Sequence, residues 1–125
     1  MRDMKVLHVE DNVYKHMNVL KQLKDMRISD VTWAQSFEEG KAKLEEGHYD
    51  LMITDMSFPI RFGEVENDDA GDMMIDLAHR IHPDMPIILV TSFRMKKDGI
   101  LGVVHYDPDE LWENDLRDLV RMVER

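Results

Sequence analysis

Acidic side chains directly follow two apolar segments of the sequence, and their types and positions could support metal or phosphoryl chemistry. Glu10 and Asp11 follow the apolar residues 6–9, and Asp55 follows residues 51–54. If both segments are strands of one parallel sheet, their carboxyl ends lie at the same edge, and these three carboxylates meet there. Like charges that close repel each other unless a cation or a shared proton intervenes, and oxygen ligands suit Mg²⁺. A carboxylate supported in this way could also accept a phosphoryl group.

Composition limits the classes of protein that this chain can represent. Its 125 residues suit one domain, 1–125, and 43% hydrophobic with 34% charged residues is typical of a globular protein. The absence of cysteine excludes disulfides and thiolate metal sites. A net charge of −10 argues against direct nucleic-acid binding. No apolar run approaches the roughly 18 residues of a membrane helix, and the N-terminus lacks a signal-peptide pattern, so we expect a cytoplasmic protein without membrane contact.

Apolar runs alternate with segments of helical periodicity along the chain. Strands are expected at residues 4–9, 31–34, 51–54, 87–90 and within 100–104. Helices are expected at residues 12–26, 36–46 and 73–81 and from Asp107 onward, with only one or two helical turns within 93–99. Asn12 and Ser36 are the expected caps of the first two helices. In the first helix, the residues expected at helical spacing are Val13, Met17, Leu20 and Leu23/Lys24. The alternation predicts an α/β protein with a parallel sheet covered on both faces.

Residues 58–69 interrupt this pattern. Pro59, Gly63 and several acidic residues predict a long polar loop, longer than is usual between a strand and a helix. The segment follows Asp55, so we expect it beside the acidic edge, as a lid or a partner contact.

The ordered motifs resemble those of response-regulator receiver domains over nearly the full chain. The matching pieces are residues 9–12, 50–59, 70–71, 82–92 and 107–111. The resemblance implies a single-domain, flavodoxin-like (βα)5 sandwich whose five-stranded parallel sheet has the order 2-1-3-4-5, here with a shortened fourth helix. It also implies that the chain is a signalling protein rather than an enzyme, with at most self-catalysed phosphoryl transfer and dephosphorylation.

The resemblance further implies roles for individual residues. Asp55 would be the phosphoacceptor, supplied by a sensor histidine kinase or a phosphotransfer protein. Glu10, Asp11, Asp55 and the backbone carbonyl of Ser57 would hold Mg²⁺. Thr91 would donate a hydrogen bond to the phosphoryl group and report its arrival to an output protein, with a second copy of this chain as another candidate partner.

Two departures from the family pattern bear on this function. Receiver domains carry a lysine at the end of the fifth strand, whereas residues 103–108 contain none. Lys96, Lys97 and His105 are the candidates to replace it. The segment between Thr91 and the last strand is also shorter than in the family, so the surface used for output must differ.

These departures leave an alternative function open: a receiver-like interaction module that works without phosphorylation. A Mg²⁺-dependent phosphohydrolase is a weaker alternative. Such enzymes carry a second aspartate two residues after the nucleophile, and Ser57 occupies that position here.

Overall fold

Five parallel strands form the central sheet of the computed structural model, which describes residues 3–124. From one edge to the other they are β2 (Asp30–Ala34), β1 (Lys5–Val9), β3 (Leu51–Thr54), β6 (Ile87–Thr91) and β7 (Gly102–His105). Because β6 and β7 are the fourth and fifth parallel strands, this is the predicted 2-1-3-4-5 order. The flavodoxin-like fold expected from the sequence is confirmed.

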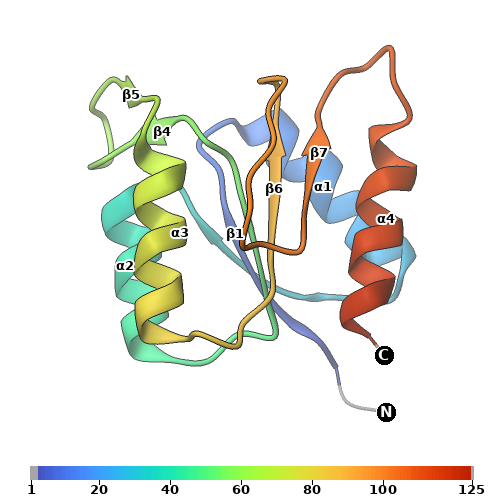
Figure 1. Ribbon diagram of the computed structural model, residues 1–125, viewed down its shortest axis with the longest axis horizontal. Coiled ribbons are helices and arrows are strands. Elements are labelled where there is room, and N and C mark those ends of the chain that lie inside the picture. Colours follow the sequence, from blue (N-terminus) through green and yellow to red (C-terminus); the bar gives the residue numbers. More distant parts are fainter. Residues whose placement is uncertain (1–2, 125) are drawn as a thin grey trace.

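Helices cover both faces of the sheet (Figure 1). They are α1 (Val13–Asp25), α2 (Phe37–Glu46), α3 (Ala70–Ile81) and α4 (Trp112–Val123). Side chains alternate across each strand, so Val6 joins the core beneath α1 and α4, while its neighbour Leu7 joins the core beneath α2 and α3. Within residues 3–124, no helix has both the length and the apolar character needed to cross a membrane.

The cap of α1 is as predicted, but its buried face is only partly so. The Asn12 side chain accepts a hydrogen bond from the backbone N–H of Lys15. Leu23 is buried as expected, whereas the prediction was wrong for Val13 and Met17, which are largely exposed. The helix buries polar residues together with apolar ones: Lys15, His16, Val19, Gln22 and Leu23. The polar members point to a function for this face beyond packing.

Residues 58–69 are more ordered than the expected loop. They contain a two-stranded antiparallel ribbon of β4 (Phe58–Pro59) and β5 (Glu66–Asn67). Phe58 is fully buried in the core beneath α2 and α3, which anchors the ribbon to the domain. Gly63, with φ of 87°, supplies a left-handed conformation in the turn between its strands.

The predicted short fourth helix is absent: residues 92–101 join β6 to β7 without a helix. The five residues of β6 span about 16 Å at 3.3 Å per residue. A helix returning over that distance would need about 11 residues at 1.5 Å each, before any turns. Residues 92–101 are too few, so the connection runs in an extended path, and Ile100 packs against the core beneath α2 and α3.

The last helix also begins later than predicted. Asp107 was expected to cap it, but α4 starts at Trp112. The Asp107 carboxylate instead accepts a hydrogen bond from the backbone N–H of Asp109, and its carbonyl accepts one from Glu110. The Asp-Pro pattern therefore forms a turn before the helix rather than the helix start.

Candidate functional site

Backbone hydrogen bonds extend the sheet pairing by one residue beyond the ends of β1, β3 and β7. They therefore fix the positions of the residues that follow these strands. The Glu10 N–H donates to Ala34 at 2.9 Å, the Asp55 N–H to Val9 at 3.2 Å, and the Tyr106 N–H to Thr91 at 2.7 Å. Glu10, Asp55 and Tyr106 line one cleft of about 500 Å³. Its lining is Glu10, Asp11, Asn12, Tyr14, Lys15, Asp55, Ser57, Glu66, Asp68, Ser92, Phe93 and Tyr106. The predicted meeting of Glu10, Asp11 and Asp55 at one edge is confirmed.

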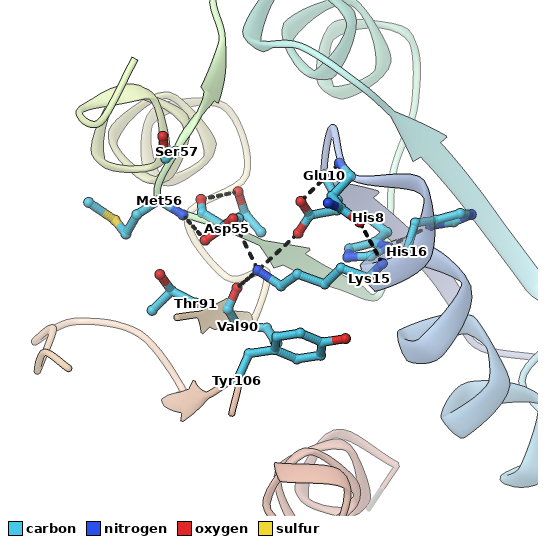
Figure 2. Close-up of polar contacts among 12 residues, drawn as sticks. His8, Glu10, Lys15, His16, Asp55, Met56, Ser57, Val90, Thr91 and Tyr106 are labelled. Atoms are coloured by element: carbon cyan, nitrogen blue, oxygen red, sulfur yellow. Dashed lines mark hydrogen bonds and ion pairs between the residues drawn. The ribbon is translucent and has the colours of Figure 1, made fainter. Parts of the chain in front are cut away.

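A lysine from α1 lies among these carboxylates. The Lys15 ammonium lies 3.0 Å from Glu10 Oε1, 3.0 Å from Asp55 Oδ2 and 2.7 Å from the carbonyl of Val90 (Figure 2). The contact with the Val90 carbonyl is a hydrogen bond, and the contacts with Glu10 and Asp55 are ion pairs. The ring of Tyr106, with its centroid 5.2 Å away, adds a cation–π contact. Lys15 therefore supplies the positive charge at the acidic edge.

Asp55 is held in a defined orientation. One carboxylate oxygen accepts the backbone N–H of Met56 at 2.7 Å, and the other faces Lys15. Helix α3 packs directly behind it, because the Gly71 N–H donates to the carbonyl of Met56 at 2.8 Å. A Cβ at Gly71 would lie 2.4 Å from the Asp55 carbonyl oxygen, so only glycine permits this approach. The Asp55 side chain remains 15% exposed, which leaves it accessible from the cleft.

Glu10 is more deeply buried than Asp55. Burial raises the pKa of Glu10 to about 7, and the ammonium of Lys15 opposes this rise. Its second oxygen accepts the backbone N–H of Asn12 at 3.2 Å. Glu10 is thus held by the start of α1 as well as by the end of β1.

The ribbon contributes two acidic residues to the cleft that the sequence argument did not select. The Ser57 hydroxyl donates to Asp68 at 2.8 Å, and its oxygen lies 3.3 Å from a carboxylate oxygen of Glu66. A hydrogen bond with Asp11 raises the pKa of Glu66, and burial adds to the rise. Glu66 and Asp68 were missed because acidic residues in a polar segment are usually solvated. Their signal was the placement of the segment directly after Asp55.

The cleft holds carboxylates of the type that a hard divalent cation prefers, although among the described residues no three of them have oxygens that all lie within 4.8 Å of one another. Asp11, Asp55, Glu66 and Asp68 offer carboxylate oxygens, and Mg²⁺ prefers such ligands. Glu10, also predicted as a ligand, contacts Lys15 and Asn12. Ser57 lies in the cleft as predicted, and its hydroxyl is bonded to the ribbon.

Thr91 lies at the carboxyl end of β6, as predicted. Its side chain is fully buried, and its hydroxyl oxygen accepts the backbone N–H of Phe93 at 3.2 Å. Its carbonyl accepts the N–H of Tyr106. Thr91 therefore joins the end of β6 to Phe93 through its side chain and to Tyr106, the residue after β7, through its backbone.

The three candidate replacements for the lysine have other surroundings. The Lys97 ammonium pairs with Asp72 at 2.9 Å, and this hydrogen bond raises the pKa of Lys97. The two ring nitrogens of His105 lie 2.9 Å from Glu110 and 3.1 Å from the carbonyl of Ser92. Lys96 is exposed. In this structure none of the three candidates pairs with Asp55.

Lys15 could have been found from its position in the sequence. It is the third residue of a helix whose first turn has no acidic residue, where the helix dipole disfavours a cation. Helical side chains also lean toward the N-terminus, which here faces the acidic edge. A lysine in such a place indicates nearby carboxylates.

A stack of three rings lies beside Lys15 and supports the backbone of Glu10. The His16 ring is 4.1 Å from Trp33, with an interplanar angle of 4°, and the Nδ1 atoms of His8 and His16 are 2.8 Å apart. Burial, followed by the charges of His16 and Lys15, holds the pKa of His8 well below its usual value. The Trp33 indole donates to the Glu10 carbonyl at 2.7 Å.

Comparison with solved structures places this fold among known proteins. Response regulator TrrA of Thermotoga maritima, in complex with Mg²⁺ and BeF, has a TM-score of 0.78 at 21% identity, covering 96% of this chain and 98% of TrrA. The receiver domain of a sensor histidine kinase from Pseudomonas aeruginosa, with a magnesium ion in its active-site cleft, has a TM-score of 0.75 at 18% identity, covering 99% and 100%. Chemotaxis response regulator CheY4 of Vibrio cholerae has a TM-score of 0.74 at 21% identity, covering 98% and 99%. The chain has the receiver-domain fold.

Sequence comparison adds less. No family model matches the chain. An uncharacterized protein of Sinorhizobium fredii, y4jS, is 32% identical over 81 residues. That match covers 63% of this chain but only 19% of the relative, so this chain corresponds to a small part of that protein.

Proposed function

We propose that this protein is a receiver of two-component signalling that accepts a phosphoryl group on Asp55. The observation that carries the proposal is the joint placement of Asp55 and Lys15 in the acidic cleft, with an ammonium 3.0 Å from a carboxylate oxygen. A carboxylate that must become an acyl phosphate needs access, orientation and nearby positive charge. Asp55 has all three in the receiver-domain fold.

The transfer follows from the geometry of Asp55. An oxygen of its carboxylate attacks phosphorus, a new O–P bond forms, and the bond from phosphorus to the donor breaks. For a phosphohistidine donor, the imidazole nitrogen keeps the bonding electron pair and leaves. The Met56 N–H holds the other oxygen, so the carboxylate stays aligned. Lys15 lies where negative charge then accumulates.

We infer that a divalent cation binds among the carboxylates of the cleft. Asp11, Asp55, Glu66 and Asp68 would hold Mg²⁺, and the backbone carbonyl of Ser57, predicted as a further ligand, lies on the same loop. When bound, the ion would neutralise charge on the transferred phosphoryl oxygens. The Mg²⁺-bearing receiver structures from Thermotoga maritima and Pseudomonas aeruginosa support this assignment.

The partners follow from this function. A cytoplasmic histidine kinase or phosphotransfer protein supplies the phosphoryl group, and an output protein binds the phosphorylated form. Because the connection between β6 and β7 lacks a helix, the output protein meets a different surface from that of receivers with a fourth helix.

Intact-protein mass spectrometry tests the proposal directly. The protein is incubated with acetyl phosphate and Mg²⁺, and we expect the mass to rise by one phosphoryl group. Asp55→Asn should remove the adduct. Asp84→Asn, which removes the same charge from an exposed residue outside the cleft, should retain it. An adduct that survives Asp55→Asn, or no adduct on the wild-type protein, would contradict the proposal.

One observation favours a second function, that of an interaction module that works without phosphorylation. Lys15 already pairs with both Glu10 and Asp55, which stabilises the acidic edge without a phosphoryl group. This function predicts no adduct on the wild-type protein, and it predicts partner binding that Asp55→Ala leaves unchanged.

A further inference from the structure

The lysine that receiver domains carry after the fifth strand is absent here, and Lys15 lies against the phosphoacceptor from another element. We propose that Lys15 contacts the phosphoryl group on Asp55 and transmits its arrival to α1. The inference rests on the proposed function, because it assigns a residue to that same site. It moves the cationic contact from the strand next to α4 to the first turn of α1.

The environment of Lys15 suits this role better than that of an ordinary surface lysine. Its side chain is only 9% exposed, and its ammonium makes one hydrogen bond, to Val90, and two ion pairs, with Glu10 and Asp55. Charge-assisted hydrogen bonds in such a desolvated site are stronger than those at the surface. The ammonium is therefore positioned before any phosphoryl group arrives.

Phosphorylation changes which acceptors Lys15 faces. Asp55 has a negative carboxylate before transfer, whereas in the acyl phosphate the negative charge lies on the phosphoryl oxygens. The donor that now faces Asp55 Oδ2 then turns to a phosphoryl oxygen. Glu10 and the Val90 carbonyl remain as its other acceptors, so Lys15 stays attached to β1 and β6 while it follows the new charge.

This contact links the site to two elements. Lys15 lies at the start of α1, where its own backbone N–H is bound by the Asn12 cap. Its ammonium reaches Val90, the residue before Thr91. A shift of Lys15 toward the phosphoryl group would therefore move the first turn of α1 relative to the end of β6.

Lys15 also opposes metal binding, because its positive charge lies beside carboxylates that would face the ion. Removing this charge should tighten Mg²⁺ binding while it slows phosphoryl transfer. A residue that only supports the fold would weaken both together. The opposite signs of these two effects distinguish a direct role from a structural one.

The experiment compares the wild-type protein with Lys15→Met, Lys15→Arg and the control Lys21→Met, an exposed lysine on the same helix. Acetyl phosphate supplies the phosphoryl group, and calorimetry measures Mg²⁺ binding. For Lys15→Met we expect roughly ten- to a hundredfold slower labelling of Asp55, the range for loss of one charged hydrogen bond. Mg²⁺ binding should tighten by about tenfold. Lys15→Arg should recover only part of the rate, since its planar group cannot reproduce the three contacts of the ammonium with Glu10, Asp55 and Val90. Lys21→Met should match the wild type.

Labelling of Lys15→Met at the wild-type rate would overturn the inference, and so would parallel losses of labelling and metal affinity. A wild-type protein that takes no label at all would instead overturn the proposed function, so the two failures are distinguishable. A second measurement keeps the test independent of the variant's folding. Beryllofluoride added to wild-type protein should shift the amide signals of Lys15 and Val90 in nuclear magnetic resonance spectra, and unchanged signals there would contradict the inference.

Discussion

The carboxyl ends of the parallel strands form the edge that carries the site. The β1 and β3 end of this edge departs from the receiver pattern in a different way from the β6 and β7 end. At the β1 and β3 end, the acidic residues lie where the sequence predicts, and a relocated cation from α1 completes them. At the β6 and β7 end, the helix between the strands is missing and His105 pairs with Glu110 rather than with the site. The first end keeps its charges close together, whereas the second end has lost a whole element.

This difference shows that charge compensation and the binding surface can change independently of each other. Charge compensation needs only an ammonium at the correct point, and a long side chain from a neighbouring helix can supply it. A binding surface needs a whole element, so residues 92–101 cannot reproduce what a helix would present. Under the proposed function, Asp55 remains the phosphoacceptor, and the arrival of the phosphoryl group is transmitted through α1.

The largest effect is expected from a substitution behind Asp55. Gly71→Ala places a Cβ 2.4 Å from the Asp55 carbonyl and 2.5 Å from Met56 Cα, both backbone atoms that cannot easily move. We expect a loss of about 2 to 4 kcal/mol in the free energy of unfolding, measured with urea. Gly47→Ala is the control, because its new Cβ would meet nothing closer than Lys5 at 4.0 Å, and it should change stability by less than about 1 kcal/mol. Equal losses for both would show that the backbone behind Asp55 is not tightly packed.

The second largest effect is expected from Glu66 and Asp68, through their contribution to metal binding. Replacing Glu66 by Gln and Asp68 by Asn removes two charges from the cleft and keeps the shape of both side chains. We expect Mg²⁺ affinity to fall by about tenfold to a hundredfold, measured by calorimetry. Asp109→Asn with Glu113→Gln removes the same charge outside the cleft and should leave the affinity unchanged. Unchanged affinity in the ribbon variant would exclude Glu66 and Asp68 as contributors to the metal site.

The pH dependence should show the opposed effects of burial and Lys15 on Glu10. We expect the Glu10 carboxyl to titrate near pH 7 in carbon-13 spectra, and Lys15→Met should move its pKa higher, because the opposing cation is gone. The folded pKa lies above the unfolded value of 4.5. The folded state therefore binds the proton more tightly, and this stabilising contribution is lost as the pH rises from 4.5 to about 7. Glu10→Gln should lack that decline, and a Glu10 that titrates near 4.5 would contradict the burial argument.

The smallest effect is expected at the other end of the edge. Arg94 pairs with Glu110 at 2.7 Å, and Glu110 also contacts His105, so the pair ties residues 92–101 to the turn before α4. Arg94→Gln should speed amide hydrogen exchange within 92–101 and leave the labelling rate of Asp55 within about twofold. A large loss of labelling would show that this end still takes part in the chemistry.

The sequence predicted the parts of the molecule that depend on local pattern. Apolar runs gave the parallel sheet, strand ends gave the meeting of Glu10 with Asp55, and Asn12 and Ser36 cap their helices as expected. These features need only neighbouring residues and the rules of parallel sheets.

The contacts of Lys15 and Glu66 were missed because they join residues far apart in the sequence. Lys15 reaches Asp55 by the length of its side chain. Apolar spacing alone had placed Val13 and Met17 on the buried face of α1, where the helix instead places Lys15 and His16. Glu66 comes into the cleft because buried Phe58 anchors the ribbon, which no pattern within the polar segment reveals. The missing helix could have been foreseen, since residues 92–101 are too few to span β6 in helical form.

A crystal structure with Mg²⁺ and beryllofluoride would show directly where Lys15 lies when Asp55 carries a phosphoryl mimic. We predict beryllofluoride on Asp55 with the Lys15 ammonium within hydrogen-bonding distance of a fluorine atom, while Glu10 and the Val90 carbonyl keep their contacts with Lys15. Beryllofluoride on Asp55 with Lys15 turned out to solvent, and Lys96, Lys97 or His105 in its place, would contradict it.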